Sequence, residues 1–484
     1  MAHLNINKDI LKLAVPSILA NITVPIVGMV DIAVAGHLTG EVATMIGGIA
    51  IGSMLFDLLY WNFGFLRVGT GGLAAQAYGG KDMRECSKIL TRALGISLAF
   101  ALLLIAIQWM FVKAAFMVVD CTPEVRELAS EYFFIRIWAA PATLSLMAFK
   151  GWFIGMQDSV SPMVTDFVVN GMNVLMSIVL ALGVPMPGTP EQATLMETAV
   201  AGRLWILRPM GFAGIAAGTV AAQYSGLLTA IVLLLAKYAR KVFADFRISD
   251  FKTVFTGSET RRFFVMNTDL FVRSLCFIAI YIGFTTISAG FGDLLLAVSS
   301  IMMKLLMIFS YFTDGFAYAG EALTGRYIGA KDQHMVKQTV KWTFVWSMGI
   351  AFIFMGIYHF AGIPMLKVMT SDAAVIEQSR EYLPWLLLMP VIGCAAFTWD
   401  GIYIGATASK DIRNAMLWAT VAFAFVWVAG RMGLDMLNPS DAQKETESYF
   451  IISMHILMAA YFAHLLARTL YLSVKYRRTF KLAA

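Results

Sequence analysis

Charged residues are scarce in this chain of 484 residues. Asp, Glu, Lys and Arg together make up 14% of the sequence, whereas 59% of the residues are hydrophobic. An ordinary soluble domain has about 25% charged residues, and the mean hydropathy here is +0.72. The composition therefore excludes a soluble globular protein. It predicts an all-α polytopic membrane protein, in which helices satisfy their own backbone hydrogen bonds within the lipid.

Cysteine is also rare, and several chemical motifs are missing. The four cysteines, Cys86, Cys121, Cys276 and Cys394, stand singly, with no CxxC pair and no metal-ligand spacing to any of the six histidines. The sequence also lacks a Walker phosphate-binding pattern and a cluster of nucleophile, base and orienting group. We therefore expect no disulfide framework, no metal or cofactor, no ATP-driven step and no enzymatic activity.

Long hydrophobic runs, by contrast, are plentiful. Twelve runs are long enough to cross a bilayer, and they start near residues 11, 45, 90, 130, 160, 211, 263, 294, 338, 383, 412 and 449. If the N-terminus is cytoplasmic, 24 of the 37 Lys and Arg residues lie in loops on that side, 8 lie on the other side and five lie within spans. This excess predicts that both termini are cytoplasmic. The basic segment 237–262 is then a cytoplasmic linker, and we expect no binding of nucleic acid.

An internal repeat divides the chain into two halves. A shift of 250 residues superposes Gly79, Lys81 and Asp82 on Gly329, Lys331 and Asp332, Glu131 and Tyr132 on Glu381 and Tyr382, and Gly151, Ile154 and Gly155 on Gly401, Ile404 and Gly405. Each half has six spans, an even number, so the halves share one orientation and are related by an axis along the membrane normal. We expect two pseudo-symmetric six-helix lobes, residues 1–236 and 263–484, with the substrate path between them.

A single carboxylate interrupts the first span. The stretch from Leu11 to Gly36 has Asp31 as its only acidic residue, and an ionised carboxylate inside a bilayer costs about 3 kcal/mol unless it has a partner, a proton or a wet cavity. Pro25 cannot donate a helical hydrogen bond to the carbonyl of Asn21, which predicts a bend, and Gly28 adds room there. Asp31 is therefore a candidate functional residue. The alternative is a structural kink with a solvated aspartate near the outer surface.

The repeat also places charged residues at equal depth in the two lobes. Three pairs of opposite sign result: Asp57 with Lys304, Arg67 with Asp314, and Lys150 with Asp400. We predict that some of these pairs latch the lobes together in one conformation, because unpaired charges in the membrane are costly. The alternative is a separate solvated group in each lobe. Asp31 has no acidic counterpart, since Tyr281 occupies the equivalent position, so the ion site is expected in the first lobe alone.

Four segments resemble a known transporter family. They read PIVGMVDIAVAG (Pro25 to Gly36), FGFLRVGTGGLAAQAYGGKD (Phe63 to Asp82), GWFIGMQDSVSP (Gly151 to Pro162) and GFAGIAAGTVAAQ (Gly211 to Gln223). Together they resemble the multidrug and toxic compound extrusion family, and FLRVGT is most similar to its subfamily of DNA-damage-inducible protein F transporters. The resemblance implies a monomer in the bacterial cytoplasmic (inner) membrane. It would export organic cations or other amphipathic compounds, driven by inward movement of protons or sodium ions.

The resemblance also assigns roles to individual residues. Asp31 matches the family's coupling carboxylate, and Asn173, Thr219 and Tyr132 match polar residues around it. Ser177 departs from the pattern, because many relatives have an acidic residue there, and Lys150 stands where relatives have a neutral polar residue. A site with one carboxylate favours a proton over sodium. If protonation of Asp31 and substrate binding exclude each other, the result is antiport.

A lipid flippase is the alternative function. More distant relatives that flip lipid-linked saccharides usually line their cavity with basic residues that hold a diphosphate. Arg67, Arg136, Lys150, Arg273 and Lys304 lie within spans and are compatible with this reading. Asp31 and the count of twelve spans argue against it. The outer loop 185–209 is longer than the repeat requires, and the sequence assigns it no role.

Overall fold

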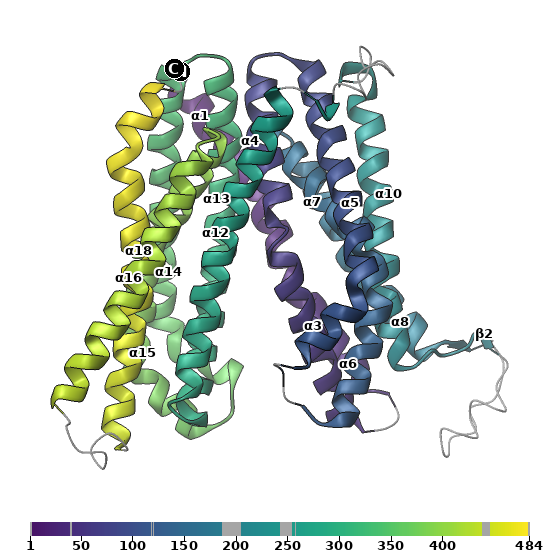
Figure 1. The fold of residues 1–484 in the computed structure, drawn as a ribbon, viewed down its shortest axis with the longest axis vertical. Helices are drawn as coiled ribbons and strands as arrows, with labels where there is room; N and C mark the ends of the chain where they lie inside the picture. The colour runs from purple at the N-terminus through teal and green to yellow at the C-terminus, as the bar shows by residue number, and fades with distance from the viewer. Residues whose placement is uncertain are drawn as a thin grey trace.

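A computed structural model describes residues 2–38, 41–117, 119, 121–185, 205–242, 254–256, 258–437 and 446–482 (Figure 1). Nearly all of these residues are helical, as expected for apolar runs that must satisfy their backbone within lipid. The elements are α1 (Ala2–Ile22), α2 (Val24–Ala35), α3 (Val42–Trp61), α4 (Gly64–Gly79), α5 (Met83–Ala115), α6 (Pro123–Arg136), η1 (Ile137–Ala139), α7 (Ala140–Gly155), α8 (Val160–Leu182), β1 (Val184–Pro185), β2 (Trp205–Leu207), α10 (Phe212–Val242), α12 (Ser258–Ala289), α13 (Asp293–Gly329), α14 (Gln333–Met369), α15 (Ala373–Gly405), α16 (Ser409–Leu437) and α18 (Glu447–Leu482).

Eleven helical stretches within the described residues are long and apolar enough to cross a membrane. Two of them are interrupted: α3 and α4 form the stretch Val42–Gly79, and α6, η1 and α7 form the stretch Pro123–Gly155. The eleven do not include α1 and α2, which a turn at Thr23 separates. The chain is therefore an all-helical polytopic membrane protein.

The helices are arranged in two bundles. The first bundle consists of α1 to α8 and α10, with α8 packed along α10, and the second consists of α12 to α16 and α18, with α16 packed along α18. The bundles meet where α13 packs against α1 and α4, and where α12 and α15 also contact α4. Figure 1 shows the bundles close together at the end where α1 begins and α18 ends, and apart at the opposite end. We call the end where they meet the terminal end.

Turns at the terminal end have matching backbone geometry in the two bundles. Within the described residues, four non-glycine residues have a positive φ: 58° at Lys81, 57° at Lys331, 65° at Gln157 and 54° at Thr407. They form two pairs that are 250 residues apart in the sequence. A left-handed conformation is uncommon for such residues, so its recurrence at this spacing is a backbone counterpart of the sequence repeat.

The helix caps after the first pair of turns match in the same way. The side chain of Asp82 accepts a hydrogen bond from the backbone N–H of Glu85 at 2.8 Å, and that of Asp332 accepts one from Met335 at 3.0 Å. Each aspartate thus satisfies a free amide in the first turn of α5 or α14. The repeated GKD segment of the sequence therefore encodes a turn and a cap.

Two glycines allow backbone contact between the bundles. A Cβ on Gly79 would lie 1.9 Å from the carbonyl oxygen of Arg326, and a Cβ on Gly329 would lie 2.0 Å from that of Gln76. Both the glycines and the residues they face are 250 residues apart. A side chain at either glycine would push α4 and α13 apart, so close packing at the terminal end requires both.

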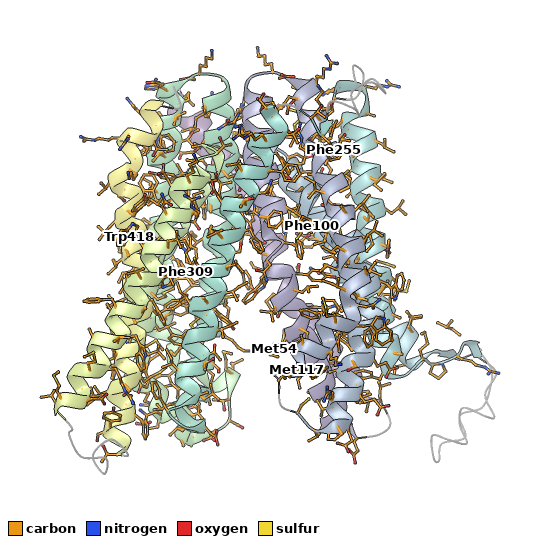
Figure 2. The ribbon with its side chains drawn as sticks, viewed as in Figure 1. Met54, Phe100, Met117, Phe255, Phe309 and Trp418 are labelled. Carbon is orange, nitrogen blue, oxygen red and sulfur yellow. The ribbon has the colours of Figure 1, made fainter. Side chains whose placement is uncertain are left out.

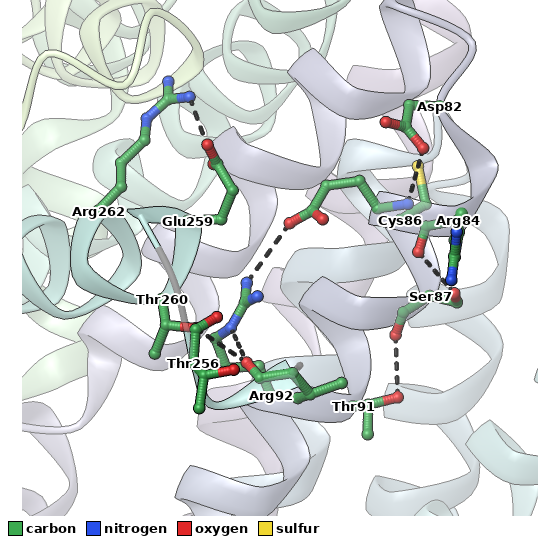
Figure 3. A network of polar contacts seen from close by, with 12 residues as sticks. Asp82, Arg84, Cys86, Ser87, Thr91, Arg92, Thr256, Glu259, Thr260 and Arg262 are labelled. Atoms are coloured by element: carbon green, nitrogen blue, oxygen red, sulfur yellow. Dashed lines mark hydrogen bonds and ion pairs between the residues drawn. The ribbon is translucent and has the colours of Figure 1, made fainter. Parts of the chain in front are cut away.

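The predicted linker is partly helical. Residues 237–242 belong to α10 and residues 258–262 belong to α12, because a charged helix end can extend beyond the lipid into water. Between them, the side chain of Arg92 on α5 donates from Nε to the carbonyl oxygen of Val254 at 2.7 Å, and its Nη1 lies 3.5 Å from Glu85 Oε1 (Figure 3). The chain is therefore anchored to the first bundle just before α12 begins. Residues 243–253 lie outside the described residues.

The ends of the predicted outer loop are paired. β1 and β2 form an antiparallel ladder in which Val184 is opposite Leu207. The intervening part of the predicted loop 185–209, residues 186–204, lies outside the described residues.

Apolar side chains cover the outward faces of the helices. Trp418 on α16 is 60% exposed, whereas Phe309 on α13 is fully buried inside its bundle (Figure 2). Large exposed apolar side chains suit contact with lipid rather than with water.

Candidate functional site

The first apolar stretch is two helices rather than one bent helix. Thr23 separates α1 from α2, and Pro25 lies in the first turn of α2, where its missing N–H costs nothing. Thr23 Oγ1 donates to the carbonyl oxygen of Ala20 at 2.7 Å and accepts a hydrogen bond from the side chain of Asn170 on α8. The helix is therefore interrupted at Thr23, between Asn21 and Pro25, where the missing proline hydrogen bond predicted a bend.

Two other residues were predicted to shape this bend. Asn21 is buried, and its Nδ2 donates to the carbonyl oxygen of Tyr311 on α13 at 3.3 Å, which joins the break to the second bundle. Gly28 is exposed, and a Cβ there would meet no atom within 4 Å. Asn21 therefore links the two bundles, whereas Gly28 lies in open space.

Asp31 is buried inside the first bundle. Its side chain is 5% exposed and faces α6 and α8. The hydroxyl of Tyr132 donates to Oδ2 at 3.4 Å, and that of Ser177 donates to Oδ1 at 3.3 Å. Both bonds are long, and within the described residues no Lys or Arg forms an ion pair with this carboxylate. Two neutral donors at this range do not fix Asp31 in its charged form.

The remaining predicted residues form a second contact beside the carboxylate. Asn173 lies one helical turn before Ser177 on α8, and its Nδ2 donates to Thr219 Oγ1 on α10 at 2.9 Å. Asn173 Oδ1 is buried and has no hydrogen-bond partner among the described residues. The structure thus brings Tyr132 on α6 and Ser177 on α8 to Asp31, and it joins Asn173 on α8 to Thr219 on α10.

The site also contains Arg136. The sequence had indicated this residue only as one of the basic residues compatible with a flippase. Its Nη1 donates to the hydroxyl of Tyr132 at 3.0 Å, and its guanidinium lies 4.8 Å from the ring centre of Phe56. The hydroxyl of Tyr132 thus accepts from Arg136 and donates to Asp31, so one residue lies between the two charges. The spacing could have indicated this role, because residues four apart share one face of a helix.

Two of the predicted latch residues pair within their own bundles. Lys150 Nζ lies 2.8 Å from Asp166 Oδ2 in the first bundle, and Asp400 Oδ2 lies 2.5 Å from Arg273 Nη2 in the second. In this structure Lys150 and Asp400 do not pair. Equal depth does not bring side chains into contact when a nearer partner lies on an adjacent helix.

The other two predicted pairs also differ from expectation. Asp57 and Lys304 are exposed, and no ion pair joins them in the described part of the chain. Arg67 does reach across to the second bundle, but its Nη1 lies 3.3 Å from Glu321 Oε2. No hydrogen bond or ion pair joins Arg67 to its predicted partner Asp314 in the part of the chain that the structure describes. Among the described residues, the one cross-bundle ion pair that involves a predicted latch residue is therefore Arg67 with Glu321.

A buried carboxyl group with weak neutral donors can gain and lose a proton. Burial disfavours its charged form, whereas donor groups and the nearby charge of Arg136 favour it. Asp31 also follows a helix break, so a change of its charge can be coupled to movement of α2. The arrangement is suited to reversible ion binding rather than to covalent chemistry.

Comparison with known proteins identifies the family. The MatE family profile matches residues 16–179 and 270–428. The chain is 31% identical over 420 residues to the DNA damage-inducible protein F of Escherichia coli, which covers 86% of this chain and 84% of that protein. It is 24% identical to the probable multidrug resistance protein NorM of Photorhabdus laumondii, with 88% and 90% covered.

A solved structure has the same fold. It is described as the outward-facing conformation of a multidrug resistance MATE family transporter of the MOP superfamily, and it aligns with a TM-score of 0.78 at 14% identity over 98% of this chain and 96% of that one. At this identity the likeness shows the fold alone. The profile match and the 31% identical relative show the family, and the protein is a multi-pass secondary transporter and not an enzyme. The chain belongs to the MatE family of multidrug and toxic compound extrusion (MATE) transporters.

Proposed function

We propose that this transporter exports amphipathic or cationic organic compounds in exchange for protons, and that Asp31 is the coupling residue. The observation that carries the proposal is the burial of this carboxylate beside two hydroxyl donors, with no cation bonded to it in the described part of the chain. Protonation would neutralise the carboxyl group and change its bonds to α6 and α8. Exclusion between the proton and the substrate then gives antiport.

A proton fits this site better than sodium. Sodium binding needs several hard oxygen ligands, whereas Asp31 is the only carboxylate of the group and Ser177 occupies the position where many relatives have an acid. Inward movement of one charge down 100 mV supplies about 2.3 kcal/mol. That energy is sufficient for a modest uphill gradient of substrate.

We further propose that the first and second bundles are lobes of six spans each. α1 and α2 together would form the twelfth span, and the lobes would extend over residues 1–236 and 263–484, joined by the linker 237–262. The two separate profile matches and the backbone features that recur 250 residues apart support this division. Six spans per lobe give the lobes the same orientation.

The excess of basic loops at the terminal end supports cytoplasmic termini. The bundles would then be closed on the cytoplasmic side and open outward, in the inner membrane of a bacterium, with each monomer forming a complete transporter. Substrate would leave from between the separated ends of the bundles.

Three of the five basic residues that the sequence places within spans do not favour a lipid flippase. Arg67, Lys150 and Arg273 each have a carboxylate within 3.3 Å, so their charges are largely neutralised. A cavity that holds a diphosphate needs several cations free to bind it. This pattern supports the drug exporter instead.

Transport into proteoliposomes tests the proposal. An imposed proton gradient should drive ethidium movement in the wild type, an imposed sodium gradient should not, and an uncoupler should abolish the movement. Asp31→Asn should transport at least about tenfold less, while Glu131→Gln, an exposed acid on α6, should behave as the wild type. Sodium-driven transport, or full activity in Asp31→Asn, would refute proton coupling at this residue.

A further inference from the structure

A cavity of about 440 Å³ opens in the second bundle at the terminal end. It lies where the end of α13, the turn into α14 and the end of α18 come together (Figure 1). Three basic residues line it: Lys331, Lys337 and Arg477. All three are exposed, and none of them forms an ion pair with another described residue. We call this space the basic cavity.

One acid in the same lining does not neutralise these cations. Asp332 Oδ1 accepts a hydrogen bond from the backbone N–H of Met335 at 3.0 Å, which caps α14. Within the described residues, Asp332 forms no ion pair with a basic side chain. Three positive charges therefore face one negative charge. Because a concave site lined by one sign of charge concentrates ions of the other sign, the basic cavity favours an anion.

The rest of the lining suits a ligand that is partly apolar. Five of the other lining residues have large apolar or aromatic side chains: Tyr327, Ile328, Val336, Tyr476 and Phe480. Aromatic rings and branched aliphatic side chains contact the carbon atoms of a ligand, while a tyrosine hydroxyl can donate to an anionic oxygen. The basic cavity can therefore hold a charged group and the start of an apolar chain together.

An apolar stripe leads away from the basic cavity along α18. Leu466, Leu470 and Val474 follow one another at intervals of four residues, and all three are exposed. Arg477 comes three residues after Val474, so the four side chains share one face of the helix. The stripe from Leu466 to Arg477 is about 16 Å long, roughly half the thickness of a hydrocarbon core. Its length thus matches one leaflet, with the arginine at the charged end.

The corresponding helix end in the first bundle is neutralised by an acid. The pattern K-Y-x-R near the end of α10, at residues 237–240, recurs near the end of α18 at residues 475–478. In the first bundle, Lys237 Nζ lies 3.0 Å from Asp158 Oδ2, and the hydroxyl of Tyr238 donates to the same oxygen at 3.0 Å. One carboxylate thus binds both side chains of the pattern.

At the equivalent positions the second bundle has one acid fewer and one base more. The shift of 250 residues places Ala408 at the position of Asp158, and the repeated pattern places Arg477 at the position of Ala239. A general excess of basic residues at the terminal end would charge both bundles alike. The difference between them instead indicates that the second bundle binds an anion here.

We propose that the basic cavity binds the phosphate of an anionic phospholipid. The phosphate would lie among Lys331, Lys337 and Arg477, and an acyl chain would follow the apolar stripe of α18. Basic pockets between transmembrane helices hold anionic head groups in this way. The cavity is lined by the second bundle alone, so the lipid is a bound partner and not a transported compound. The inference does not depend on the proposed substrates or coupling ion.

Native mass spectrometry of the full chain tests the inference. The delipidated protein in detergent would be titrated with phosphatidylglycerol and phosphatidylcholine that have the same acyl chains. The wild type should bind its first phosphatidylglycerol about tenfold or more tightly than phosphatidylcholine, because the net negative charge meets three cations. A triple variant with Lys331→Gln, Lys337→Gln and Arg477→Gln should lose this preference.

Asp332→Asn should bind phosphatidylglycerol about fivefold more tightly than the wild type, because one negative charge is removed from the lining. Asparagine also caps helices, so the start of α14 is preserved. Asp82→Asn is the matched control, since Asp82 forms the equivalent cap on α5, and it should bind as the wild type does. Misfolding does not raise affinity, so it cannot imitate this result.

Two further arms separate this site from general charge effects and from a site for free phosphate. Lys81→Gln, Arg240→Gln and Lys241→Gln together remove the same charge from the terminal end of the first bundle and should keep the lipid preference. Glycerophosphate, which lacks acyl chains, should displace the lipid about 100-fold more weakly than phosphatidylglycerol does. The inference is overturned by an unchanged preference in the cavity variant, a lost preference in the first-bundle variant, no gain in Asp332→Asn, or equal displacement by glycerophosphate.

Discussion

The cross-bundle ion pair of Arg67 and Glu321 shows how one residue can hold two bundles together. Glu321 is fully buried and its second oxygen, Oε1, has no hydrogen-bond partner among the described residues. Arg67 also lies 4.4 Å from the ring centre of Tyr318. A buried pair contributes little in total, but loss of one partner leaves an uncompensated charge.

We therefore expect Arg67→Gln to lower the free energy of unfolding by about 3–5 kcal/mol. The double variant Arg67→Leu with Glu321→Leu should recover most of this loss, because no charge remains buried. Denaturant unfolding in detergent micelles measures both. Glu259→Gln is the control, since Glu259 and Arg262 form an exposed pair at 4.0 Å that contributes about 0.5 kcal/mol or less. Equal losses in Arg67→Gln and Glu259→Gln would contradict the account.

At the residue scale, the sequence predicted Asp31 from its burial cost and its neighbours from family resemblance. The structure brings Tyr132 and Ser177 to this carboxylate. It also adds Arg136, because an i, i+4 contact within α6 depends on which face of that helix is turned inward. The predicted latch pairs show the limit of such reasoning. A repeat gives the depth of a residue but not its direction, so it could not identify Glu321 as the partner of Arg67.

At the element scale, the break between α1 and α2 lies eight residues before Asp31, and in the proposed cycle it would let α2 move when the carboxylate changes charge. A hydrogen bond from the side chain of Asn170 on α8 to Thr23 holds the break in place. Pro25 has no N–H to donate to the carbonyl oxygen of Asn21, which removes one helical hydrogen bond at this point. The sequence predicted an interruption here but not the contact that holds it. The side chain of Asn170, distant in sequence, binds Thr23.

Pro25→Ala should restore a helical hydrogen bond and join α1 to α2. We expect ethidium transport in proteoliposomes to fall several-fold, while the unfolding midpoint in detergent does not decrease. Pro16→Ala is the control, because Pro16 lies inside α1 without a break, and it should leave transport nearly unchanged. Similar transport by the two variants would show that the break is not needed for the cycle.

At the scale of the whole molecule, the close contact at the terminal end defines the shape. Gly79 and Gly329 let α4 and α13 approach until backbone meets backbone, while the bundles separate at the other end (Figure 1). The sequence predicted two halves with a repeat of 250 residues but not the turns and caps at that spacing, although turns and caps use local signals. Which helices meet between the bundles depends on long-range packing, which hydrophobic periodicity does not encode.

Gly79→Ala and Gly329→Ala should each open the terminal end. The added methyl group would overlap a backbone oxygen, so we expect a loss of about 1–3 kcal/mol in the free energy of unfolding. Spin labels at Arg84→Cys and His334→Cys, in a variant without the four native cysteines, should show a longer distance across this end. Gly349→Ala is the control, since a Cβ there meets no atom within 4 Å. An unchanged distance in Gly79→Ala would contradict the packing account.

The proposed exchange of protons for substrate at Asp31 is tested most directly by proton release. Purified transporter in weakly buffered detergent solution would be titrated with substrate while a pH indicator records the protons released. We predict release of up to about one proton per bound substrate in the wild type and in Glu131→Gln, and none in Asp31→Asn. Unchanged release in Asp31→Asn would show that the coupling proton is bound elsewhere.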